Sequence, residues 1–60
     1  MEEADVIRAA DALSALYASD AVRHALARAL KLLDCGDNAG CKDWVRVAEA
    51  ITELNRRSPT

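Results

Sequence analysis

One stretch of the chain decides the fold: Leu32-Leu-Asp-Cys-Gly-Asp-Asn-Ala-Gly-Cys-Lys-Asp-Trp44, which holds both glycines and both cysteines of the 60 residues. Gly36 stands where a left-handed residue closes a helix, and residues 36–40 have the composition of a turn. Helix-forming residues dominate on both sides of this turn. The stretch therefore predicts a helical hairpin, with one helix over about 20–34 and the next over about 41–57.

Apolar residues on either side of the turn recur at the spacing of one face of an α-helix. After the turn, this set consists of Trp44, Val47, Ala48, Ile51 and Leu54. Before the turn, it consists of Val22, Ala25, Leu26, Ala29, Leu30 and Leu33. We expect both sets to point into the core.

A further helix is predicted over about 2–17, with its own apolar set of Val6, Ala9, Ala10, Leu13, Leu16 and Tyr17. This set is nearly half a turn out of phase with the one that follows, which indicates a break at residues 18–20. Ser19 or Asp20 is expected to cap the helix that begins there. One long helix with a twisted apolar stripe is the alternative.

The expected fold is all-α: a small three-helix bundle with helices at about 2–17, 20–34 and 41–57, forming one domain over residues 1–60. Thirteen alanines against fifteen large hydrophobic side chains make a thin core, and a chain of this length buries only about 60% of its unfolded surface. We therefore expect a supplement, either a disulfide or completion of the bundle by homodimerisation.

Cys35 and Cys41 flank the turn, so a disulfide between them is geometrically plausible. Closing this loop of about seven residues would contribute roughly 2.4 kcal/mol in the chain-entropy model. Two free thiols are the alternative, because thiols stay reduced in the cytoplasm. His24 lies roughly 16 Å along the helix from Cys35, too far to share a metal ion. We expect no metal site and no other cofactor.

Catalytic motifs are lacking, and His24 falls among basic residues on a polar helix face, as a solvated histidine does. We therefore expect neither enzyme activity nor catalytic residues. The acidic start Met1-Glu-Glu-Ala-Asp5 lacks the basic character of a targeting signal, and no apolar run approaches the roughly 18 residues of a membrane span. The expected location is the cytoplasm, with no membrane partner.

A net charge of −2 argues against nucleic acid as a partner. The basic residues of the last predicted helix leave open a small nucleic-acid-binding regulator as an alternative, although three acids interrupt them. These basic residues are Lys42, Arg46, Arg56 and Arg57.

Three large apolar residues, Ile7, Leu32 and Val45, fall outside the predicted core stripes, on the flanks or backs of their helices. Monomers seldom expose large apolar patches, so a partner surface would bury them. The sequence thus favours a non-enzymatic protein–protein interaction module that acts through helix faces and either self-associates or docks on another chain. An artificial helical scaffold or binder is a further alternative. No family is assigned from the sequence.

Overall fold

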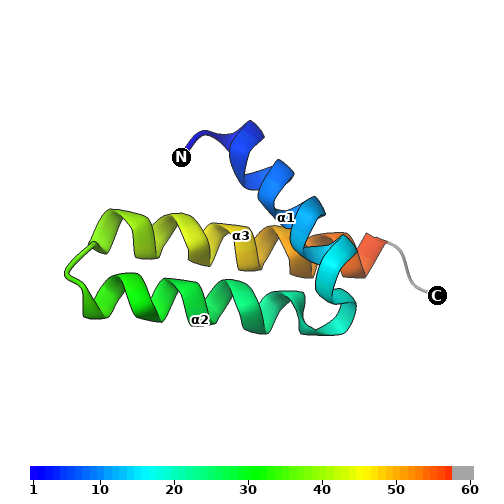
Figure 1. Ribbon diagram of the computed structural model, residues 1–60. Coiled ribbons are helices and arrows are strands. Elements are labelled where there is room, and N and C mark those ends of the chain that lie inside the picture. The colour runs from blue at the N-terminus through cyan, green and yellow to red at the C-terminus, as the bar shows by residue number, and fades with distance from the viewer. Residues whose placement is uncertain (58–60) are drawn as a thin grey trace.

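The computed structural model describes residues 1–57, and the fold is all-α, as predicted (Figure 1). Its elements are helix α1 (Glu3–Tyr17), one turn of 3-10 helix η1 (Ala18–Asp20), helix α2 (Ala21–Asp34) and helix α3 (Asn38–Arg57). Because η1 joins α1 to α2 without a gap, residues 3–34 form one helical run with a bend. The three separate helices expected from the sequence are therefore seen only in part: a bent helical segment packs against α3.

The bend lies at Ala18, where the backbone has φ 47° and ψ −116°. A positive φ is rare for a residue with a Cβ atom and costs on the order of 1–3 kcal/mol. The bend lies where the sequence predicts a break, at residues 18–20, but the helical run continues through it. The predicted cap is wrong, because Asp20 occupies the N-cap of α2 without a side-chain hydrogen bond. At the end of α1, the N–H of Ala18 donates to the carbonyl oxygen of Ser14.

Helix α2 ends as predicted, with Gly36 at φ 83°. The N–H of Gly36 donates to the carbonyl of Leu33 at 3.0 Å, and the N–H of Asp37 donates to that of Leu32 at 2.8 Å. These two bonds define a Schellman motif, which turns the chain back toward the start of α2 and needs a residue that tolerates positive φ. The result is the antiparallel hairpin of α2 and α3 that Figure 1 shows.

Helix α3 begins at Asn38, three residues before the predicted start at 41. The side chain of Asp37 explains the difference, because its Oδ1 accepts a hydrogen bond from the N–H of Gly40 at 2.8 Å. This is the bond of an N-cap residue to the third helical position. A Cβ atom on Gly40 would lie 2.5 Å from Oδ2 of Asp37, so glycine leaves room for the cap. Gly40 therefore belongs to the helix and not to the turn.

Replacing Asp37 with alanine is expected to lower the free energy of unfolding by about 1 kcal/mol, because the cap on α3 is lost. Urea denaturation followed by circular dichroism measures the change. Asn38→Ala is the matched control, since Asn38 lies next to the cap and makes no capping bond to Gly40. Equal stability of the Asp37→Ala variant and the parent protein would show that the cap does not hold the start of α3.

The core is built largely from small side chains. Ile51 and Val47 of α3 are its largest fully buried residues, and the predicted apolar set of α3 is confirmed as core-facing. From the other two helices, the fully or almost fully buried residues are Val6, Ala10, Ala21, Ala25 and Ala29. The alanines of α2, at positions 21, 25 and 29, let α2 approach α3 closely. The distance between packed helices depends on the side chains at the contact.

Trp44 lies at the edge of this core, partly buried and packed against it, as the sequence predicts. The guanidinium of Arg28 lies over its ring, with the central carbon 5.4 Å from the ring centroid. This cation–π contact links α2 to α3 at the edge of the core, in addition to the contacts of the buried alanines.

Helix α1 packs mainly on α3 and contacts α2 less. Its N-terminal end is tied to α3 by two ion pairs, one between the Met1 amino group and Asp43 at 3.3 Å and one between Glu3 and Arg46. In Figure 1 the N-terminal half of α1 accordingly lies far from α2. As a consequence, α1 leaves much of α2 uncovered.

Candidate protein interface

Helix α2 exposes three leucines on one side. Leu26, Leu30 and Leu33 have 42%, 64% and 49% of their surface accessible. Their spacing of four and three residues places them in one row along the helix, which we call the leucine face. The apolar pattern predicts all three in the core, and that prediction is wrong: the side of α2 that meets α3 is lined by Ala21, Ala25 and Ala29, one position over.

The exposure of the leucine face follows from the placement of α1. A third helix lying along α2 would cover these leucines, but α1 is held on α3 by Val6 and Ala10 in the core and by the ion pair of Glu3 with Arg46. The bend at Ala18 sets the direction in which α1 leaves α2. The exposure of the leucine face is thus set by how the helices pack, and the apolar pattern of α2 alone does not predict it.

The end of α1 is also open. Leu16, predicted to be a core residue, is exposed, and so is Tyr17, whose ring stacks on that of His24 with 3.6 Å between centroids and 18° between planes. His24 itself is exposed, as predicted for a solvated histidine. The stack joins the last residue of α1 to α2.

Two charged residues border the leucine face. Arg23 lies three residues before Leu26, and Asp34 lies four residues after Leu30, so both are neighbours of the face on the helix surface. Both side chains are exposed, and within residues 1–57 neither has an ion-pair partner. The face therefore has a positive end and a negative end.

The three residues proposed from the sequence as interaction candidates lie on three different helices. Ile7 and Val45 are exposed, at 48% and 39%, whereas Leu32 is partly buried. Ile7 lines a groove between α1 and α3, and Val45 is not among the residues that line that groove. The larger apolar surface on α2 was missed because size and periodicity alone place leucine before alanine in a core. The repeat of alanine at positions 21, 25 and 29 forms a second stripe on the same helix, and the sequence of α2 alone does not decide which stripe meets α3.

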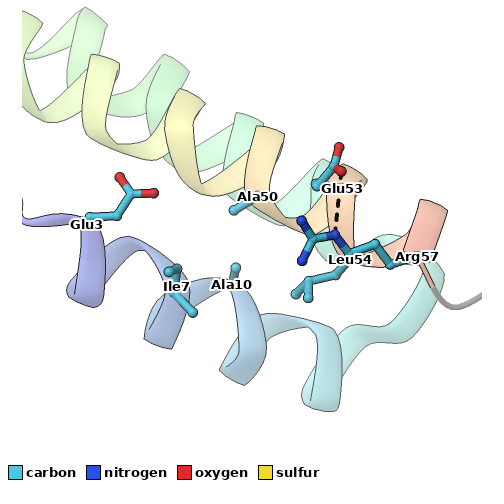
Figure 2. A pocket seen from close by; sticks show the side chains of 7 residues that line it. All are labelled: Glu3, Ile7, Ala10, Ala50, Glu53, Leu54 and Arg57. Carbon is cyan, nitrogen blue, oxygen red and sulfur yellow. Dashed lines mark ion pairs between the residues drawn. The ribbon is translucent and has the colours of Figure 1, made fainter.

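The groove between α1 and α3 has a volume of about 280 Å³ and an apolar floor (Figure 2). Its lining residues are Glu3, Ile7, Ala10, Ala50, Glu53, Leu54 and Arg57. On its rim, Glu53 and Arg57 form an ion pair at 3.6 Å, as the spacing of four residues predicts. No cysteine, histidine or serine is among these lining residues.

Both cysteines are free thiols in the structure: Cys35 is exposed and Cys41 partly buried. The disulfide considered from the sequence is therefore not formed here, and the thin core is not supplemented by a covalent link. Among residues 1–57, no cluster of three or more histidine, cysteine, aspartate or glutamate side chains is placed to hold a metal ion.

Comparison with known proteins yields no match to a family model, to a curated protein or to a solved structure. Over residues 1–57, no helix combines the length and the apolar character that crossing a membrane requires. The residues and their arrangement are thus the basis for a functional assignment.

Proposed function

We propose that this protein is a non-enzymatic protein–protein interaction module that associates through exposed helix faces, with the leucine face of α2 as its principal surface. The observation that supports this proposal is the row formed by Leu26, Leu30 and Leu33, each with at least 42% of its surface exposed. Complete burial of a leucine side chain contributes roughly 1.5–3 kcal/mol. Burying these half-exposed leucines against a partner would therefore stabilise the complex.

The composition of the core supports the same proposal. Among residues 1–57, only Ile51 and Val47 are large side chains with no exposed surface, and most of the other buried residues are alanines. Domains of about 60 residues are marginally stable even with better cores. Burying the leucine face against a second helix would enlarge the apolar interior, which is the supplement that the sequence requires.

The proposal predicts that the protein self-associates and that its melting temperature rises with protein concentration, because a partner that binds only the folded chain stabilises it. Sedimentation equilibrium and thermal melts from about 5 μM to about 1 mM measure both effects. Leu30→Glu is expected to abolish association, since it places a charge in the centre of the face. Val45→Glu, a matched change of an exposed apolar residue on α3, is expected to leave association intact.

Two results would contradict this function. A chain that stays monomeric over the whole concentration range, with a constant melting temperature, has no self-associating surface. Loss of association in Val45→Glu but not in Leu30→Glu would move the surface from α2 to α3.

A further inference from the structure

We infer that the partner is a second copy of this chain, with the two α2 helices packed antiparallel across a two-fold axis so that Arg23 of each copy pairs with Asp34 of the other. This inference rests on the proposed function and specifies its partner and geometry. It follows from three features of α2: the spacing of the leucines, the placement of the charges that border them, and the direction of the helix dipole.

The leucine face fits a copy of itself in the antiparallel direction. In a two-fold interface the same patch is used by both subunits. If Leu26 of one copy lies opposite Leu33 of the other, the midpoint of the contact falls between residues 29 and 30, and Leu30 lies next to the axis. The row then spans about 10 Å along the helix at 1.5 Å per residue, short enough to be matched over its full length.

The charges fit the same register. Pairing Arg23 with Asp34 gives a midpoint between residues 28 and 29, one residue from the midpoint of the leucine pairing. In an antiparallel pair, a difference of one residue between midpoints is a difference of two residues in register, about 3 Å along the helix, which the long arginine side chain bridges. A parallel arrangement would instead place Arg23 against Arg23 and Asp34 against Asp34, and like charges across an interface are unfavourable.

The charges are also placed against the dipole of their own helix. Arg23 lies in the first turn of α2, where an acid is favourable, and Asp34 is its last residue, where a base is favourable. Each placement therefore weakens an isolated α2. In an antiparallel pair, Arg23 comes to the C-terminal end of the second α2 and Asp34 comes to its N-terminal end, where both charges are favourable. Because both charges become favourable in the pair, a second antiparallel copy fits the leucine face better than an apolar surface without charges does.

Charge exchange tests the arrangement. Arg23→Glu and Asp34→Arg each turn two attractive contacts of the dimer into two repulsive ones, and each is expected to raise the dissociation constant at least about fourfold. The double variant exchanges both charges and restores both contacts, so its dissociation constant is expected to return to within about threefold of the parent value. Sedimentation equilibrium at low salt measures all four proteins.

Unfolding of the single variants would not produce this pattern of dissociation constants. Both single changes improve the match to the dipole of α2, so the helicity of the monomer, measured by circular dichroism at high dilution, is expected to stay equal or to rise. Arg8→Glu on α1, an exposed arginine away from the leucine face, is the control for a general effect of net charge.

The outcomes separate the two proposals. Weak dimerisation in both single variants with recovery in the double variant establishes the antiparallel pair. Unchanged dimerisation in both single variants, combined with its loss in Leu30→Glu, overturns the antiparallel geometry and leaves the leucine face as the interaction surface. A parent protein that is monomeric at every concentration overturns both the antiparallel pair and the self-associating form of the proposed function.

Discussion

Replacing Ile51 with alanine is expected to remove about 2–5 kcal/mol of stability, the range for deleting the side chain of a buried isoleucine. Ile51 is fully buried and is one of only two large side chains of the core that are completely enclosed. Chains of 60 residues have a total stability of only about 3–9 kcal/mol. The variant is therefore expected to melt at least about 10 °C below the parent protein or to be largely unfolded at room temperature.

Urea denaturation and thermal melts at one fixed low protein concentration measure this effect without a contribution from association. Val45→Ala is the matched control, because Val45 lies on the same helix but is 39% exposed. It is expected to change stability by no more than about 0.5 kcal/mol. Similar losses in the two variants would mean that α3 does not present Ile51 to the core.

The features that the sequence predicts correctly are local ones. The left-handed residue Gly36 closes α2, with its own N–H donating to Leu33 and the N–H of Asp37 donating to Leu32, and these bonds depend only on the neighbouring backbone. The apolar set of α3 is also correct, since α3 contacts both α1 and α2 and buries a wide stripe. Features fixed by a single helix and its own ends are therefore accessible to pattern analysis.

The start of α3 is a local feature that was nevertheless missed. Two glycines and an asparagine within five residues indicate a turn by composition. The Asp37 side chain, however, caps a helix whose third residue is Gly40. Turns and capped helix starts use the same residue types, so composition does not distinguish them. The hydrogen bond from the N–H of Gly40 to Asp37 makes this stretch a helix start.

The assignment of the leucine face could not be made from α2 alone. A helix with both alanines and leucines on its apolar side can turn either set toward its neighbour, because periodicity gives the direction of the stripe only to within one residue position. The distance between α2 and α3 and the position of α1 decide whether the alanines or the leucines face the core. The distance between α2 and α3 depends on the alanines of α2, and the position of α1 depends on the bend at Ala18, where a residue with a Cβ atom has φ 47°.

Replacing Ala25 with leucine is expected to cost at least about 1–3 kcal/mol, the range for adding methyl and methylene groups to a packed core. Ala25 has no exposed surface and lies among the core residues, so a larger side chain there forces α2 away from α3. Ala27→Leu is the control, since Ala27 lies on the same helix and is exposed; its stability is expected to stay within about 0.5 kcal/mol of the parent value. Urea denaturation measures both variants. If Ala25→Leu is instead as stable as the parent protein, α2 does not meet α3 through its alanines. The leucine face would then point inward, and the surface proposed for association would be part of the core.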